Sequence, residues 1–132
     1  MTCFYFKKSR TVSGFTLIEL LVVLAIVSML LTLAVPRFFS SVDTAKETIL
    51  VENLRLTRET LDKFYADVGR YPESLDELVE SQYLKDLPND PVANSRTAWV
   101  IVPPKAGSKG KVFDIHSSAP GKNRMGQPFE QL

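Results

Sequence analysis

The sequence predicts an α+β protein in which one long N-terminal helix packs on a small C-terminal antiparallel sheet. Three observations predict this class. An apolar run occupies residues 15–35, apolar side chains continue at helical spacing to residue 68, and two short β-rich segments lie at 98–102 and 111–115. The helix is therefore expected to have a transmembrane half and an amphipathic half.

The apolar run is long enough to cross a bilayer. Of its 21 residues, 17 are apolar, and about 20 residues at roughly 1.5 Å each span a hydrocarbon core of about 30 Å. A buried core helix is the alternative, but a domain this small has no interior in which a helix could be apolar on all sides. The run therefore predicts a transmembrane helix.

Composition limits the remaining classes. A chain of 132 residues with 45% hydrophobic residues and a net charge of +1 is expected to form one domain and is not a disordered chain. Its single cysteine, Cys3, excludes an intramolecular disulfide and any multi-cysteine zinc or iron-sulfur site.

Basic residues before the run predict its orientation. Lys7, Lys8 and Arg10 place the N-terminus in the cytoplasm and everything after residue 35 outside it, by the positive-inside rule. A secretory signal peptide also begins with basic residues. It has a shorter apolar core and a small-residue cleavage site, however, whereas Pro36 and Arg37 follow this run.

The start of the run carries the most specific motif of the chain. Residues 13–26 read SGFTLIELLVVLAI and resemble the class III signal of type IV pilins and type II secretion pseudopilins. The resemblance implies that a prepilin peptidase cuts between Gly14 and Phe15 and that the new amino terminus of Phe15 is methylated. Glycine suits a protease, because the backbone before the cut carries no side chain.

This resemblance divides the chain into three parts. It implies a basic leader of residues 1–14 that is removed, a transmembrane and assembly segment of residues 15–35, and a periplasmic pilin-like domain of residues 36–132. Cys3 lies in the leader, so the mature protein would contain no cysteine.

Glu19 is the only ionisable side chain in the run. A lone carboxylate in hydrocarbon is costly enough that it usually has a partner or a function; a wetted or protonated glutamate near the interface is the alternative. After cleavage Glu19 would lie four residues from the amine of Phe15, and positions four apart share a helix face. By resemblance, Glu19 recruits the amino terminus of an adjacent subunit as that subunit leaves the bilayer for the filament.

Apolar side chains at three- and four-residue spacing extend the helix beyond the membrane. They are Leu50, Leu54, Leu61, Phe64 and Val68, with Thr57 in the same stripe. Pro36 removes an intrahelical hydrogen bond and is predicted to kink or locally open the helix. The resemblance gives its neighbourhood a part in assembly. Gly69 is predicted to end the helix.

The rest of the chain predicts small elements. A short helix is expected over residues 74–81. The strands at 98–102 and 111–115 are expected to pair around a loop rich in proline, glycine and lysine. A weaker pattern predicts a third strand at 128–132.

A second set of residues narrows the resemblance. Residues 65–72 read YADVGRYP and are followed by Leu75, Leu78, a Leu-Pro pair at 87–88 and an Asp-Pro pair at 90–91. They resemble the major (G-type) pseudopilin of type II secretion. Major type IV pilins usually close a C-terminal loop with a disulfide, which this chain cannot form. The resemblance therefore implies a structural subunit of a type II secretion pseudopilus, which polymerises through its N-terminal helix to drive protein export across the outer membrane.

One family feature is missing. G-type pseudopilins hold a calcium ion in a C-terminal loop that contains aspartates, but the corresponding residues 117–126 read SSAPGKNRMG and contain no carboxylate. Calcium binds several oxygen ligands, usually including carboxylates. We therefore expect no family-type calcium site, and no other metal or cofactor.

Other chemistries have weaker patterns. His116 is the only histidine and no nucleophilic set surrounds it, so an enzyme is not expected. Trp99 and Phe113 are expected in the core rather than as a stacking platform. A basic tail could bind nucleic acid. The favoured interpretation is instead a solvated loop that lies against the acidic helix region. The tail cations are Lys105, Lys109, Lys111, Lys122 and Arg124.

The resemblance also implies partners and a location. The expected partners are other copies of the chain, minor pseudopilins, the prepilin peptidase, and an inner-membrane platform with its ATPase; nucleic acid is not expected. The expected location is the bacterial inner membrane, crossed once, with a periplasmic C-terminal domain and then a periplasmic filament. The alternatives are a type IV pilin for adhesion or motility, a DNA-uptake competence pseudopilin, and a bitopic binding protein that does not polymerise.

Overall fold

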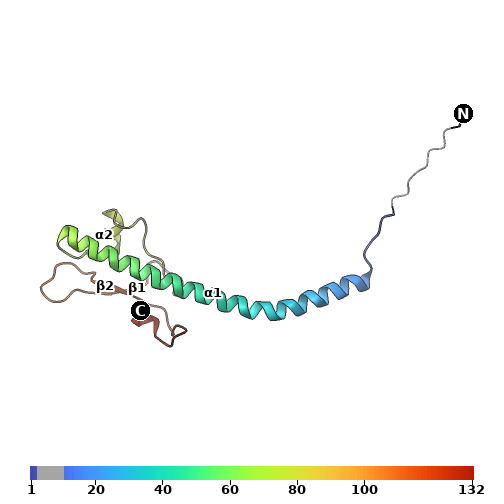
Figure 1. Ribbon diagram of the computed structural model, residues 1–132. Helices are drawn as coiled ribbons and strands as arrows, with labels where there is room; N and C mark the ends of the chain where they lie inside the picture. Colours follow the sequence, from blue (N-terminus) through green and yellow to red (C-terminus); the bar gives the residue numbers. More distant parts are fainter. Residues whose placement is uncertain (3–10) are drawn as a thin grey trace. The chain divides into compact units, whose positions relative to one another are not determined.

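The computed structural model describes residues 1–2 and 11–132 and has the predicted α+β class (Figure 1). By its internal contacts the chain divides into two compact units, Met1–Phe38 and Phe39–Leu132. The elements in chain order are helix α1 (Leu17–Val68), helix α2 (Leu75–Glu80), strand β1 (Trp99–Val102), strand β2 (Asp114–Ser117) and the 3-10 helix η1 (Phe129–Gln131).

Helix α1 confirms the single long helix, with 52 residues. It ends at Val68 because Gly69 takes a left-handed conformation, with φ of 78°, and donates its N–H to the Tyr65 carbonyl at 2.8 Å. The helix runs without a break through Pro36. Of the two effects predicted for this proline, a kink or a local opening, the opening is not present in this structure, and a change of the helix during assembly stays a prediction.

The second unit has one hydrophobic core, to which every element contributes. The face of α1 that enters it comprises Leu50, Leu54, Thr57, Leu61 and Phe64. Val68 belongs to the same stripe by spacing but is exposed, because the helix ends there and nothing packs over its last residue.

The short second helix begins where the sequence predicts. The Ser74 side chain caps it by accepting the N–H of Glu77 at 3.3 Å. Arg70, just after α1, donates to the Glu77 carboxylate at 2.5 and 3.2 Å, and Glu77 also accepts the N–H of Glu73 at 2.6 Å. The Arg70 guanidinium and the Glu73 N–H hold the pKa of Glu77 below its ordinary value.

The two strands form an antiparallel pair in which Trp99 lies opposite Ser117 and Val102 opposite Asp114. The first strand confirms the prediction, but the second begins at Asp114 instead of residue 111. Residues 111 and 112 do not join the strand, because the N–H groups of Lys111 and Val112 both donate to the Pro72 carbonyl at 3.0 Å.

Two further predictions for the C-terminal third are wrong. Residues 129–131 form η1 instead of a third strand, and only an isolated bridge joins Lys122 to Pro128. Phe113 is 44% exposed and sets its ring edge against Tyr71, with centroids 5.3 Å apart, so it is not a core residue. Trp99 is buried as expected, and its indole N–H donates to the Pro88 carbonyl at 2.9 Å.

Candidate processing and assembly site

The predicted cleavage site lies in non-helical chain just before α1. Residues 11–16 have no regular secondary structure, and the helix begins at Leu17. The Gly14–Phe15 bond is therefore outside the helix, where a backbone can be presented in extended form. Phe15 is 87% exposed, and nothing lies within 4 Å of the position that a Cβ on Gly14 would take.

Thr16 fixes the first turn of the helix. Its hydroxyl accepts the N–H of Glu19 at 3.2 Å and its carbonyl accepts the N–H of Leu20 at 3.2 Å. A threonine followed three residues later by glutamate is the pattern of a capping box. The helix thus starts two residues later than predicted, and Phe15 precedes it instead of lying on its face.

Glu19 lies in the first turn of α1, where a negative charge interacts favourably with the helix dipole. Within residues 11–132 its carboxylate has no hydrogen-bond or ion-pair partner. The other polar side chains of the run bond to their own helix: Ser28 donates to the Leu24 carbonyl at 2.7 Å and Thr32 to the Ser28 carbonyl at 2.9 Å. Glu19 is therefore the polar side chain of the run for which the described residues provide no hydrogen-bond or ion-pair partner.

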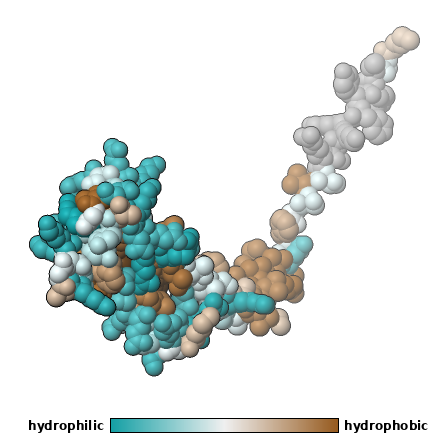
Figure 2. Space-filling model, turned by 60° about the vertical axis from the view of Figure 1, so that its left-hand side comes forward, coloured by the Kyte–Doolittle hydropathy of each residue, from teal (hydrophilic) through white to brown (hydrophobic). Residues whose placement is uncertain are grey.

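The apolar side chains around Glu19 are also uncovered. Every residue from Leu17 to Val35 is exposed, and in Figure 2 the visible surface of this helical segment is predominantly brown. Among the described residues, α1 is the one helix long and apolar enough to cross a membrane. Such a surface requires either lipid or other protein around it.

Three predicted residues cannot be placed. Lys7, Lys8 and Arg10, the charges of the leader, lie outside the described residues, as does Cys3. Pro36 lies inside α1, in the same unit as Glu19 and Phe15.

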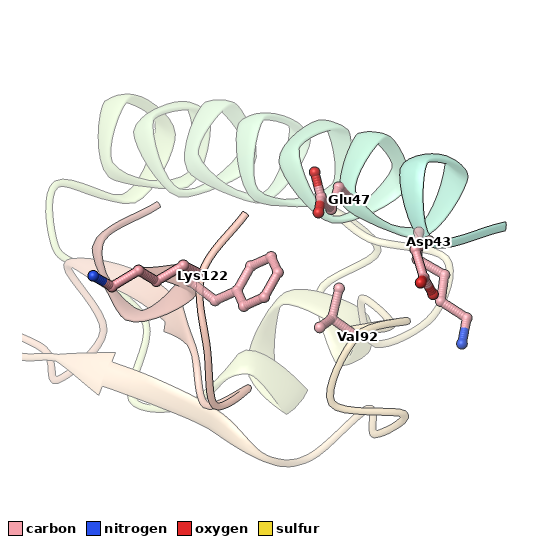
Figure 3. Close-up of a pocket in the computed structure, with 6 residues that line it drawn as sticks. Asp43, Glu47, Val92 and Lys122 are labelled. Atoms are coloured by element: carbon pink, nitrogen blue, oxygen red, sulfur yellow. The ribbon is translucent and has the colours of Figure 1, made fainter. Parts of the chain in front are cut away.

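Ion pairs confirm that part of the basic tail faces acidic residues. Arg124 lies 3.4 Å from the Glu47 carboxylate on α1, and Lys111 lies 3.4 Å from Glu73. A hollow of about 280 Å³ lies beside Glu47 and is also lined by Asp43, Lys46, Val92, Lys122 and Phe129. Figure 3 shows this part of the structure. Its charges are mixed and Lys122 points away from the α1 carboxylates (Figure 3), so it offers neither a phosphate site nor a catalytic set.

The loop expected to lack calcium is closed by an asparagine. The Asn123 side-chain oxygen accepts the N–H of Met125 at 3.0 Å and that of Gln127 at 2.9 Å, and the Asn123 N–H donates to the Gln127 carbonyl at 2.8 Å. The protein itself thus supplies the contacts that hold this loop together. Among residues 1–2 and 11–132, no group of three or more His, Cys, Asp or Glu side chains is arranged to hold a metal. The expectation of no calcium stays a prediction.

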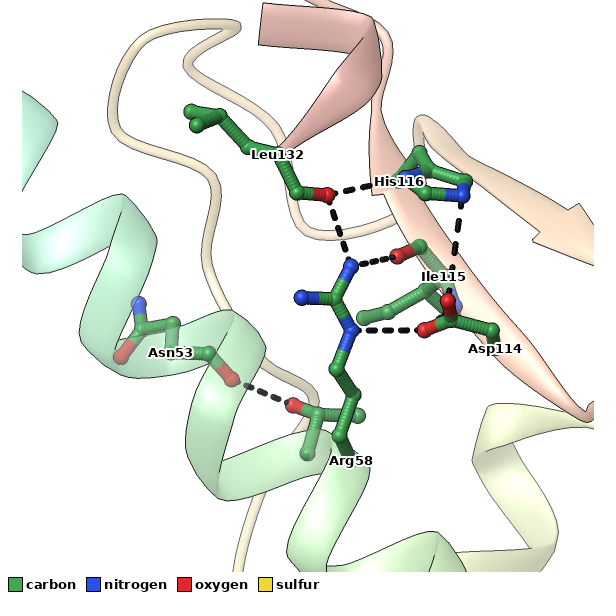
Figure 4. Close-up of polar contacts among 7 residues, drawn as sticks. Asn53, Arg58, Asp114, Ile115, His116 and Leu132 are labelled. Carbon is green, nitrogen blue, oxygen red and sulfur yellow. Dashed lines mark hydrogen bonds and ion pairs between the residues drawn. The ribbon is translucent and has the colours of Figure 1, made fainter.

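Sequence reasoning missed a polar cluster that ties α1 to the sheet (Figure 4). Arg58 of α1 donates to the Asp114 carboxylate at 2.7 Å, to the Ile115 carbonyl at 3.1 Å and to the Leu132 backbone oxygen at 2.7 Å. His116 makes a 2.9 Å hydrogen bond from Nδ1 to the same Leu132 oxygen. His116 therefore has a structural role in this cluster. The sequence had singled it out only as the one histidine of the chain.

Asp90 was also missed as a buried anchor. Its carboxylate accepts the N–H groups of Val92 and Ala93, each at 2.9 Å, and the hydroxyl of Ser117 on β2. The Asp-Pro pair indicated a turn, which this is. No local sequence pattern indicated that the same carboxylate would bind Ser117 on β2, which lies 27 residues further along the chain.

Comparison with known proteins places the chain. A family profile described as "Prokaryotic N-terminal methylation motif" matches residues 9–35, which include Gly14, Phe15 and Glu19. The match places the chain among proteins that carry this N-terminal motif. The protein named type II secretion system core protein G of Pseudomonas aeruginosa is 35% identical, over 86% of this chain and 87% of its own. That of Escherichia coli strain K12 is 31% identical, over 81% of each chain.

The chain therefore belongs to the type II secretion system core protein G family. A more distant relative is the Competence protein ComGC of Halalkalibacterium halodurans, 28% identical over 68% of this chain and 90% of its own. No solved structure matches the chain.

Proposed function

We propose that the chain is a structural subunit of a type II secretion pseudopilus, which polymerises through its N-terminal helix to drive protein export across the outer membrane. The observation that carries the proposal is the apolar half of α1, which the core of the chain leaves uncovered from Leu17 to Val35. Family membership supplies the context of a secretion machine. In this account no catalytic role falls to the chain.

Processing would precede assembly. A prepilin peptidase would cut between Gly14 and Phe15 and the new amine of Phe15 would be methylated, which removes Lys7, Lys8 and Arg10. The exposed non-helical position of this bond supports the assignment, because a protease acts on an extended backbone. Without those three cations the side chains carry 13 basic and 15 acidic groups, since the full chain has 16 and 15.

Glu19 would act between subunits. Its carboxylate is the unmet polar group of the run, and the amine of Phe15 on an adjacent copy would supply the matching charge. Taking either charge into an apolar helix bundle alone is costly, whereas the pair enters at lower cost. Pro36, which leaves the carbonyl of Thr32 without its usual i+4 N–H donor, is the point at which the helix could adjust during assembly.

The proposed setting follows from the same residues. The chain would cross the inner membrane once, with its N-terminus in the cytoplasm and residues 36–132 in the periplasm, before it enters the filament. Its partners would be further copies of itself, minor pseudopilins, the prepilin peptidase, and the membrane platform with its ATPase. No calcium would be needed to close the C-terminal loop, since Asn123 closes it.

Export in cells that lack their own copy tests the proposal. Wild-type chain is expected to restore secretion and to form filaments visible by electron microscopy. Glu19→Ala should be inserted in the membrane and fail in both, because the paired charge is lost. Ser28→Ala is the matched control, since the Ser28 hydroxyl bonds only to its own helix; it should assemble normally. Normal filaments from Glu19→Ala would contradict the proposed role.

The competence relative suggests one other function to test. A DNA-uptake subunit should retain DNA in a salt-dependent manner. We expect no retention at physiological salt, since Lys111 and Arg124 of the basic tail are already paired with carboxylates. Retention that falls steeply with salt would favour the competence assignment.

A further inference from the structure

The second half of α1 has an uncovered apolar stripe on the flank of its buried face. Val42, Ala45, Ile49 and Leu56 succeed one another by three, four and seven residues, so they share one face of the helix. Ile49 is 48% and Leu56 is 45% exposed. At about 100° per residue, this stripe lies about a third of a turn from the face that enters the core.

Polar rows bound the stripe on both sides. On the side of the core, Asn53 donates to the Asn89 carbonyl at 2.6 Å. On the other side, Arg55 pairs with Glu52 at 2.7 Å and with Glu59, which raises the pKa of Arg55 and lowers that of Glu52. These charges engage one another along the helix. The apolar strip between them is left as a narrow, well-defined surface.

The spacing of the stripe indicates what covers it. Apolar residues that repeat every seven positions pack helices side by side at a small crossing angle. The same spacing continues upstream in the sequence at Phe38, Val35 and Leu31. Ala45 within the stripe is small enough to let a neighbouring backbone approach closely. A second helix suits this stripe, because the stripe continues the spacing of the segment through which the chain is proposed to assemble.

Lipid is excluded as the occupant by the charges of the same segment. Seven ionisable side chains lie between residues 43 and 59 of α1, a density that a bilayer core does not accept. They are Asp43, Lys46, Glu47, Glu52, Arg55, Arg58 and Glu59. A contact between two protein helices in water, in contrast, accommodates charged side chains along its edges.

We propose that the stripe Val42–Ala45–Ile49–Leu56 is a contact surface for helix α1 of a second copy of this chain. Assembly then does not stop at the membrane segment but continues along the outer half of the same helix. The proposal rests on the proposed function, because it takes the chain to form a filament of identical subunits. It adds which face of the outer helix the next subunit covers.

Val51 supplies a matched control. It is 50% exposed, on α1, and lies about as far from the buried face as the stripe does, but on the opposite flank. A substitution at Val51 thus equals one at Ile49 or Leu56 in exposure, secondary structure and side-chain type. Only the face differs.

Thiol labelling measures coverage at each position. Ile49→Cys, Leu56→Cys and Val51→Cys are each made in full-length chain with Cys3→Ser, so that each protein has one thiol. A maleimide reagent is applied to filaments isolated from lysed cells and to the same chain dispersed in detergent. We expect labelling at 49 and 56 to slow by more than about tenfold on assembly, because the centre of an interface excludes water, and labelling at 51 to stay unchanged.

Three results would overturn the inference. If positions 49 and 56 label as fast in filaments as position 51, the stripe is not covered. If they are already protected in dispersed chain, something other than a second copy covers them. If filaments form and export is normal when Ile49 and Leu56 are both replaced by Asp, the contact is dispensable. Absence of filaments from the wild-type chain would instead overturn the proposed function, and this inference with it.

Discussion

The two units of the chain contain the same kinds of apolar side chain and use them in opposite ways. From Leu17 to Val35 every leucine and valine is exposed, and the hydroxyls bond to their own helix. In Phe39–Leu132, Leu50, Leu54 and Leu61 of the same helix are buried, and polar groups reach across the fold to hold segments far apart in sequence. Helix α1 therefore contributes side chains to the hydrophobic core in the second unit and leaves its apolar side chains exposed in the first.

Matched leucines test this contrast most strongly. Leu54→Ala should destabilise the outer domain by about 3 kcal/mol, because it removes a buried side chain and leaves a cavity. Leu24→Ala, in the exposed half, should change the free energy of unfolding by less than about 0.5 kcal/mol. Denaturant unfolding in detergent, followed by the fluorescence of Trp99, the single tryptophan, reports on the outer domain alone. Equal losses would mean that the two units do not fold separately.

Two arginines of α1 allow a matched comparison: Arg58 belongs to the polar cluster of Figure 4, and Arg55 lies on the exposed surface of the helix. Arg58→Ala should cost about 2 kcal/mol, because it removes three hydrogen bonds and leaves Asp114 without its cation. Arg58→Lys should restore only part of this, since an ammonium cannot reproduce the fork of a guanidinium. Arg55→Ala, which breaks only exposed pairs, should leave stability unchanged within error. A comparable loss at Arg55 would contradict the assignment.

The sequence predicted those features that depend on near neighbours. The long helix and its end at Gly69, the short helix after Ser74 and the motif around Gly14 and Glu19 all depend on spacings of a few residues. Arg58 was not predicted, because its partner Asp114 lies 56 positions away. The second strand began later than predicted for the same reason, since Lys111 and Val112 bond to the distant carbonyl of Pro72.

The candidate site divides in the same way. The motif identified Gly14, Phe15 and Glu19 as a set, and the structure adds that Thr16 ends the non-helical segment before the helix. What Glu19 contacts in an assembly depends on a second copy, which no local spacing describes. Pro36 was expected to kink or locally open the helix, and in this structure its one missing N–H does not interrupt the 52 residues of α1.

Acid should weaken the outer domain through Glu77. Its pKa is lowered in the folded state, so its contribution is present above the ordinary pKa of 4.5 and is lost as pH falls through the folded value. Glu77→Gln should therefore lower stability at pH 7 and make little difference well below pH 4.5. The measurement is thermal unfolding of both proteins across this range. A deficit that persists unchanged in acid would rule out the Arg70–Glu77 pair as its cause.

The smallest effect is expected from calcium. Adding calcium or a chelator should leave Tm unchanged, because a ligand stabilises only a protein that has a site for it. Asn123→Ala should lower stability by about 1 kcal/mol through the loss of two backbone hydrogen bonds. Asn123→Asp, which keeps an oxygen in the place of Oδ1 to accept both N–H groups, should be closer to wild type. A rise in Tm on adding calcium to the wild-type chain would show that the loop takes the ion after all.

The mass of the subunit within isolated filaments tests the central claim most directly, because it reports processing and assembly together. Filaments are isolated from lysed cells that produce the chain, and the subunit is analysed by mass spectrometry. The account predicts a chain that begins at Phe15 with one methyl group on its amine. A filament subunit that retains residues 1–14, or a processed chain that forms no filament, would contradict it.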